Sequence, residues 1–304
     1  MANFQEIFRE VDDEARGAKN PHDVVRNKYL KQLADRTGRN VLAYYSGWLQ
    51  KDDYRLGYQV SINDEDKNGF MACFHGQDFT KGLDLILHTP GGQVAATESI
   101  IHYIRSKYGA NVRVFVPQLS MSGGTMIALS GKEVWMGLHS NLGPIDPQFG
   151  GRPAQLVIAE WERALEEVKA DPDRMAIWRP ILEQIHPTFI STCEHAIKWS
   201  KEIGKKALMD GMFKDDPQAE AKAEKIVEGL TDAETNMNHG KHLHREECEE
   251  LGLRIMNLEV DQDMQDAVLC VHHAFMISLM NTDQVKIIEN NAGISHVKLA
   301  SISL

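Results

Sequence analysis

The chain has 304 residues, enough for one large domain or two small ones. Hydrophobic residues make up 42% and charged residues 25%, which is the ordinary balance of a globular protein in water. The 44 acidic residues outnumber the 33 basic ones and give a formal charge of −11. This charge argues against a nucleic-acid partner, because phosphate contacts need clustered Lys and Arg.

No segment has the character of a membrane span or a secretion signal. An apolar run of about 18 or more residues is absent, and the first residues lack an apolar core of signal-peptide length. The four cysteines are far apart in the chain and form no C-x-x-C pair, so we expect free thiols rather than disulfides or a zinc ribbon. The sequence therefore predicts a cytoplasmic protein without a membrane span.

Residues 1–40 form an N-terminal segment for which we expect two short helices that separate near Pro21. Residues 41–49 read as a buried strand, which opens a core unit over 41–153. Within this unit, strands and helices alternate: strands at 83–88, 112–117 and 133–136, and helices at 94–108 and 122–130. This order predicts βαβ units and a mostly parallel sheet, an α/β fold.

The loop over 139–151 is rich in Pro and Gly and is expected to be irregular. From residue 154 the pattern turns helical, and residues 154–304 are expected to complete the same domain. We expect helices at 154–170, 174–184, 186–210, 219–229, 245–253 and 263–280, and terminal strands at 285–289 and 295–301.

Two glycine turns each follow an apolar strand of the core. The first is Thr89-Pro90-Gly91-Gly92, and the second is Ser120-Met121-Ser122-Gly123-Gly124. Right-handed crossovers would bring both turns to the carboxyl edge of the sheet. Acyl transfer needs a nucleophile and N–H donors for the oxyanion, and Ser122 with Gly91 and Gly92 could supply them. The simpler alternative is that Ser122 caps a helix and the glycines only form turns.

These motifs resemble a known group of proteases. The Thr-Pro-Gly-Gly-Gln-Val run is similar to the Pro-Gly-Gly strip of ClpP-type and signal-peptide-peptidase-type proteases of the crotonase-like superfamily, and the Ser122 turn is similar to their nucleophile turn. Over roughly residues 40–300, the chain resembles the serine dehydrogenase proteinase (SDH proteinase) family. The resemblance includes the 143–148 loop, the histidine-rich loop at 239 and the helix over 246–253.

The resemblance implies a crotonase/ClpP-like spiral of βαβ units with additional C-terminal helices, and the activity of a serine endopeptidase. It implies Ser122 as nucleophile, Asp146 and His239 as its partners, and Gly91, Gly92 and Gly123 as the oxyanion hole. ClpP-type proteases carry their histidine where this chain reads Leu142-Gly143-Pro144, so the identity of the base stays open. Signal peptide peptidases use a lysine instead, and the candidates are Lys198, Lys201, Lys205 and Lys206.

We expect a peptide or unfolded protein as substrate and, by analogy with superfamily relatives, a homo-oligomer. No metal is expected, since the sequence has no H-E-x-x-H motif, and no cofactor is expected, since it also has no G-x-G-x-x-G dinucleotide fingerprint. Three alternatives remain open: a crotonase-like acyl-CoA enzyme, another hydrolase such as an esterase, and a non-catalytic scaffold of the same fold.

Overall fold

The computed structural model describes residues 3–51, 53–232 and 240–301 of the chain. Its main sheet has seven strands: β1 (Asn40–Ser46), β2 (Leu83–His88), β3 (Val112–Val116), β5 (Glu133–Met136), β10 (Ile255–Asn257), β11 (Gln284–Asn290) and β12 (Ser295–Leu299). Their order is β10-β5-β3-β2-β1-β11-β12. The first five are parallel, and β11 pairs antiparallel with both β1 and β12. The mostly parallel α/β sheet is thus confirmed.

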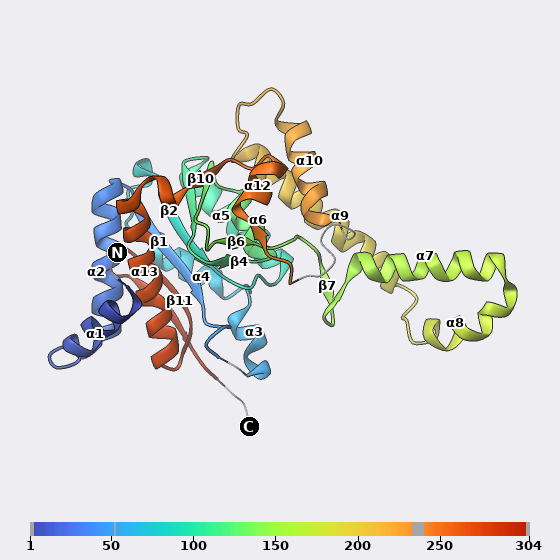
Figure 1. Ribbon diagram of the computed structural model, residues 1–304, viewed down its shortest axis with the longest axis horizontal. Coiled ribbons are helices and arrows are strands. Elements are labelled where there is room, and N and C mark those ends of the chain that lie inside the picture. The colour runs from blue at the N-terminus through green and yellow to red at the C-terminus, as the bar shows by residue number, and fades with distance from the viewer. Residues whose placement is uncertain (1–2, 52, 233–239, 302–304) are drawn as a thin grey trace.

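Helices cover both faces of this sheet (Figure 1). One face carries α1 (Phe4–Glu14), α2 (Pro21–Thr37) and α13 (Gln262–Asn281), and the other carries α4 (Asp66–Phe74), α5 (Val94–Tyr108) and α6 (Gly123–Leu129). Successive strand residues point to opposite faces, so Leu85 and Leu87 join the core beneath α5 while Ile86 joins the core beneath α13. This double burial explains why the strands read as continuous apolar runs.

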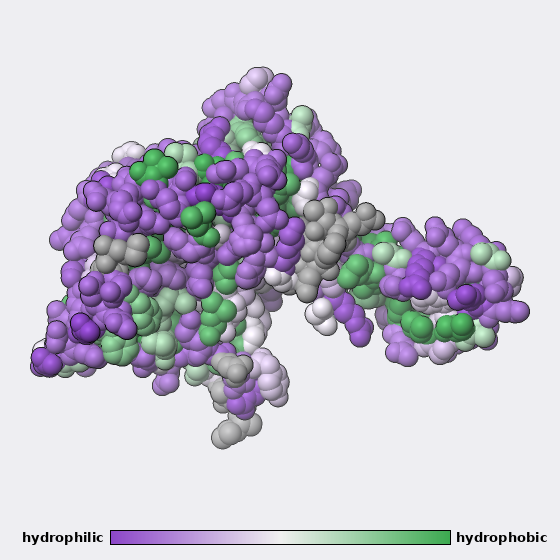
Figure 2. Space-filling view, viewed as in Figure 1, coloured by the Kyte–Doolittle hydropathy of each residue, from purple (hydrophilic) through white to green (hydrophobic). Residues whose placement is uncertain are grey.

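The C-terminal half adds helices to the α6 side. These are α9 (Phe189–Asp210), α10 (Ala219–Thr231) and α12 (Arg245–Leu251). Between β5 and α9, the strands β7 (Gln148–Phe149) and β8 (Arg152–Pro153) lead into α7 (Ala154–Ala170) and α8 (Met175–Leu182). Helices α7 and α8 form an arm that projects from the body of the molecule (Figure 1). Figure 2 shows apolar side chains gathered on this arm.

Short elements complete the fold. A second sheet joins β4 (Leu119–Ser120), β6 (Asn141–Leu142) and β9 (Leu243–His244), and a single helical turn, α3 (Gly57–Val60), precedes α4. The described residues also form 3-10 turns at Tyr54–Leu56, Phe79–Lys81, Pro172–Arg174 and Leu258–Val260. None of the helices in the described parts of the chain combines the length and apolar character needed to cross a bilayer.

The long predicted elements are present, with ends that shift by a few residues. The differences lie in short strands: β4, β8, β9 and β10 were not expected, and the predicted loop over 139–151 contributes β6 and β7. Strands of two or three residues are too short to show an alternating pattern, so they form through pairing with distant segments.

Candidate functional site

The two glycine turns lie side by side at the carboxyl edge of the main sheet. The Thr89 N–H donates to Leu119 O at 3.1 Å, and the Met121 N–H donates to Thr89 O at 3.0 Å. These bonds form an isolated parallel bridge between Thr89 and Ser120. The predicted convergence of the turns is therefore confirmed, and β4 is the element that joins them.

Ser122 occupies a strained backbone conformation directly before α6. Its φ of 51° and ψ of −113° lie where residues other than glycine are rarely found. Such a conformation costs about 1–3 kcal/mol, so the surrounding structure must impose it. Ser122 is half-buried and directly precedes helix N–H groups that have no acceptor within the helix.

Gly91 packs against this turn, and Gly92 packs against Ile62, more closely than any side chain would allow. A Cβ atom on Gly91 would lie 2.6 Å from Met121 O and 2.8 Å from Ser122 Cβ. One on Gly92 would lie 2.3 Å from Ile62 N. Glycine at position 91 therefore lets the strip approach Ser122, and glycine at position 92 lets it pair closely with Ile62.

The N–H groups of Gly91 and Gly92 have different hydrogen-bond surroundings. The Gly91 N–H donates to Thr89 Oγ1 at 3.2 Å, a hydrogen bond within its own turn. The place of Gly91 in the oxyanion hole stays a prediction. Gly92 pairs with Ile62 in a parallel bridge in which Ile62 N donates to Gly91 O at 2.8 Å and Gln93 N donates to Ile62 O at 2.9 Å. In this pattern the N–H of Gly92 itself points away from Ile62.

The backbones of Gly92 and Gly123 come close to each other at the edge of one pocket. A Cβ atom on Gly123 would lie 3.4 Å from Gly92 N, which shows how near the two backbones are. Among the described residues, neither N–H donates to a protein acceptor. Gly123 is the first residue of α6, where an N–H has no partner within the helix and carries the positive end of the helix dipole.

A pocket of about 510 Å³ opens over this strip. Its walls come from the glycine turns, from the 146–149 loop and from α9. The lining residues are Ser61, Pro90, Gly91, Gly92, Gln93, Val94, Ala95, Ser122, Gly123, Met126, Asp146, Pro147, Gln148, Phe149, Ala196, Trp199 and Ser200. The lining thus combines apolar side chains with a few polar groups, as expected of a site that binds a chain and reacts with one of its carbonyl groups.

Asp146 lies in the wall of this pocket, on a loop that is fixed to the Ser122 turn. The Thr125 hydroxyl lies 2.9 Å from Ser120 O and 2.8 Å from Gly143 O, and it accepts the Gly143 N–H at 3.1 Å. The Asp146 carboxylate accepts a hydrogen bond from Gln148 Nε2 at 2.7 Å. The structure therefore brings Ser122 and Asp146 to one pocket.

The predicted base, His239, lies outside the described residues. The described residues on either side of it are held by the Asp146 loop. Ile145 N donates to Leu230 O at 2.8 Å, and β9 pairs with β6 so that Leu142 lies opposite Leu243. Both flanks of the 233–239 stretch are thus attached to the same loop as Asp146.

A second histidine, His88, ends the strand before the first glycine turn, but it does not line the pocket. It ends β2 on the opposite face of the sheet, where its ring packs against Trp48 and Tyr45. Burial lowers the pKa of His88 to about 3. A histidine that is neutral and enclosed in this way cannot exchange protons with Ser122.

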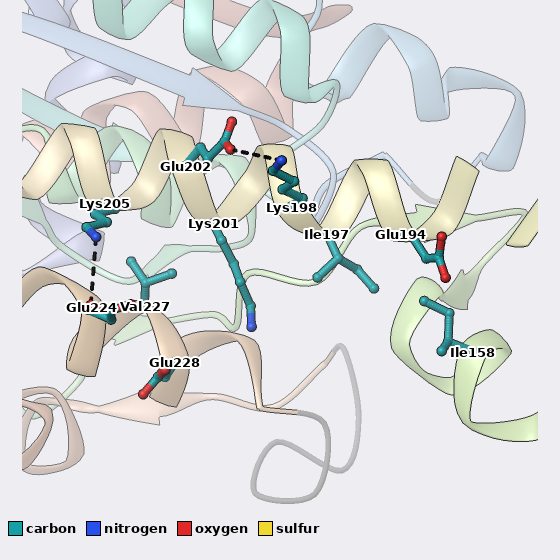
Figure 3. Close-up of a pocket in the computed structure, with 10 residues that line it drawn as sticks. All are labelled: Ile158, Glu194, Ile197, Lys198, Lys201, Glu202, Lys205, Glu224, Val227 and Glu228. Atoms are coloured by element: carbon teal, nitrogen blue, oxygen red, sulfur yellow. Dashed lines mark ion pairs between the residues drawn. The ribbon is translucent and has the colours of Figure 1, made fainter. Parts of the chain in front are cut away.

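The four candidate lysines on α9 face away from the Ser122 pocket. Lys198, Lys201 and Lys205 line a separate groove of about 490 Å³ between α9 and α10, where Lys198 and Lys205 form ion pairs with Glu202 and Glu224 (Figure 3). The hydrogen bond to Glu220 raises the pKa of Lys205. A lysine base must be desolvated to lose its proton near neutral pH, and these side chains are not.

Lys206 lies beside Arg105 and Asp210 at a third site. Within the described parts of the chain, no lysine lines the Ser122 pocket. The face of α9 that does line it carries Ala196, Trp199 and Ser200, which sequence reasoning did not select. Their i, i+3, i+4 spacing was the available signal, but it indicates any buried helix face.

No metal site is found in the described residues, where no three His, Cys, Asp or Glu side chains gather as a metal ion requires. The fold and the pocket define a mixed α/β protein with a serine-bearing pocket at the carboxyl edge of a mainly parallel sheet. A family model described as "ClpP-like SDH-type serine proteinase" matches residues 24–290. The chain belongs to this family of serine proteinases.

Two relatives come from the archaeon Methanocaldococcus jannaschii. The uncharacterized protein MJ0137 is 32% identical over 148 residues, which covers 49% of this chain and 50% of that relative. The uncharacterized protein MJ1495 is 30% identical over 143 residues, covering 47% and 49%. The chain thus matches about half the length of these curated relatives, whose names carry no statement of activity.

Proposed function

We propose that this chain is a serine peptidase in which Ser122 is the nucleophile. The observation that carries the proposal is the strained Ser122 turn, packed against the glycine strip and next to two free N–H groups. Strain of this kind persists where the surrounding structure imposes it, and it is concentrated at functional sites. Membership of a serine proteinase family supports the same reaction.

In the proposed reaction, Ser122 Oγ attacks the carbonyl carbon of a peptide bond and loses its proton to a general base. The carbonyl oxygen becomes an oxyanion that accepts hydrogen bonds from the N–H groups of Gly92 and Gly123. Collapse of the tetrahedral intermediate breaks the C–N bond, and the base returns its proton to the leaving amine. Water then hydrolyses the acyl-enzyme by the same route in reverse.

We further propose His239 as the base and Asp146 as the residue that orients it. The support is the anchoring described above, since the loop that carries Asp146 also holds the chain on both sides of the stretch that contains His239. A carboxylate that accepts the imidazole N–H favours the tautomer that can take the serine proton. The placement of the four lysines on other surfaces leaves the histidine as the preferred base.

The proposed substrate is an extended peptide or an unfolded chain. An extended segment can lie beside the Gly91–Gly92 backbone as an added strand, which places one carbonyl at Ser122. The lining by Val94, Met126 and Trp199 favours an apolar side chain next to the cleaved bond.

A fluorophosphonate probe tests the proposal, because it forms a stable adduct only with an activated serine. We expect labelling of the wild type and loss of labelling in Ser122→Ala. The matched control is Ser120→Ala, since Ser120 lies in the same turn but is fully buried, and it should keep labelling. A folded wild type that is never labelled would favour a scaffold or an acyl-CoA enzyme.

We also propose that the chain forms a homo-oligomer through the α7–α8 arm. The arm exposes Ile177 and Ile181 on α8 and Leu156 on α7, and an apolar groove of about 420 Å³ runs between its helices. Large apolar side chains on a projecting arm are best stabilised by burial against another copy. Light scattering should show an assembly in the wild type that Ile177→Glu with Ile181→Glu dissociates; a monomeric wild type would refute the proposal.

A further inference from the structure

A buried ion pair contacts the backbone segment that pairs with the glycine strip. Lys286 on β11 is 2.7 Å and 2.9 Å from the two carboxylate oxygens of Asp66 on α4, and the Tyr44 hydroxyl donates to the same carboxylate at 2.8 Å. The two charged side chains are 2% and 3% exposed. Burying a charge pair rarely stabilises a fold more than apolar residues of the same size would. The pair therefore invites a role other than stability.

Both members of the pair hold the same short segment of backbone. Lys286 Nζ donates to Ser61 O at 2.7 Å, and Asp66 Oδ2 accepts the N–H of Asn63 at 3.0 Å. Ile62, between these two anchors, is fully buried. The ion pair thus fixes the segment from both ends.

Ile62 in turn holds the strip that faces Ser122. Its N–H donates to Gly91 O and its carbonyl accepts the Gln93 N–H, so the peptide groups on both sides of Gly92 are bonded to one residue. With its neighbours fixed in this way, the direction of the Gly92 N–H is set by the position of Ile62. A shift of Ile62 would rotate that N–H away from the oxyanion.

We propose that Lys286 and Asp66 are positioning residues that, through Ile62, aim the Gly92 N–H at the oxyanion. This inference rests on the proposed function of Ser122. Hydrogen bonds to an oxyanion accelerate the reaction only when donors are held at the position where charge develops. Loss of the pair should therefore slow acylation while leaving the affinity for the ground state unchanged.

The same strand carries a matched ion pair on its other face. Arg26 Nε donates to Glu289 Oε2 at 2.7 Å, and these side chains are 0% and 2% exposed. Glu289 lies three residues after Lys286 on β11, and Arg26 belongs to α2, away from the glycine strip. Replacing Lys286 or Arg26 by Met thus removes a comparable buried cation, but only the Lys286–Asp66 pair contacts the Ile62 segment.

The test compares Lys286→Met with Arg26→Met by the rate of fluorophosphonate labelling at Ser122, at a temperature where both variants are folded. We expect Lys286→Met to lower the maximal labelling rate by about tenfold or more, without a change in probe affinity. Arg26→Met should keep the wild-type rate even where its melting temperature falls as far. Equal rates in the two variants would overturn the proposal.

A milder pair of variants applies if Lys286→Met does not fold. Tyr44 and Tyr45 are neighbours on β1, both fully buried, and their hydroxyl groups contact Asp66 and His272 on opposite faces of the sheet. Tyr44→Phe should slow labelling, and Tyr45→Phe should not. If the wild type itself is not labelled, the proposed function fails; if it is labelled and Tyr44→Phe matches Tyr45→Phe, only the positioning role fails.

Discussion

The strained backbone of Ser122 makes a prediction that runs against the usual effect of glycine. Replacing a helix-starting residue by glycine normally destabilises a protein, because glycine has more conformational freedom when unfolded. At a φ of 51° and ψ of −113°, however, a Cβ atom costs about 1–3 kcal/mol that glycine does not incur. The larger conformational entropy of glycine in the unfolded chain offsets about 0.4–1 kcal/mol of this gain. We therefore expect Ser122→Gly to be more stable than Ser122→Ala by about 1 kcal/mol.

Chemical denaturation of the two variants side by side measures this difference, because both lack the serine hydroxyl and differ only in Cβ. The same comparison by thermal unfolding should show Ser122→Gly melting about 1–2 °C higher. Both variants should be inactive towards the fluorophosphonate probe. Equal stability, or a more stable alanine variant, would show that the turn relaxes and that Ser122 is not held under strain.

Three further predictions concern the surroundings of the site. His88→Leu should weaken the loss of stability on acidification: burial holds the pKa of His88 at about 3 in the folded protein, whereas the unfolded chain binds the proton below about pH 6.5. The free energy of unfolding of the wild type should therefore fall by about 2 kcal/mol between pH 6.5 and 5 because of this residue. Chemical denaturation of both proteins at the two pH values measures this fall, and an equal fall in His88→Leu would refute the prediction. Thr125→Val should destabilise the fold by about 1–3 kcal/mol, because the Gly143 N–H loses its buried acceptor; a neutral effect on the denaturation midpoint would contradict this. Asp146→Asn should retain the fold but lower the rate of Ser122 labelling by about 10²-fold or more, and an unchanged rate would remove Asp146 from the mechanism.

The sequence was sufficient for the parts of the site that are local. A strand, a glycine turn and a helix follow one another along the chain around both Gly91 and Ser122, so the turns and their meeting at the sheet edge could be predicted. The arrangement of α5 on the sheet followed in the same way from its buried face, which includes Ile100 and Ile104. These features depend on patterns within a single βαβ unit.

The rest depends on contacts between distant segments. Lys286 and Asp66 are separated by 220 positions, and neither residue stands out in a sequence whose charged residues are mostly on the surface. The hydrogen bond from the Gly91 N–H to the Thr89 side chain also had no signal in the sequence. The sequence also could not show which face of α9 lines the pocket, because lysines and apolar residues alternate around this helix.

The most direct test of the central claim is a crystal structure of the Ser122 adduct with a peptidyl phosphonate. Our account predicts that the phosphorus is bonded to Ser122 Oγ. It also predicts that one phosphoryl oxygen lies about 2.7–3.1 Å from the nitrogen atoms of both Gly92 and Gly123. An adduct on another residue, or an oxygen that points away from these two N–H groups, would contradict the proposed site.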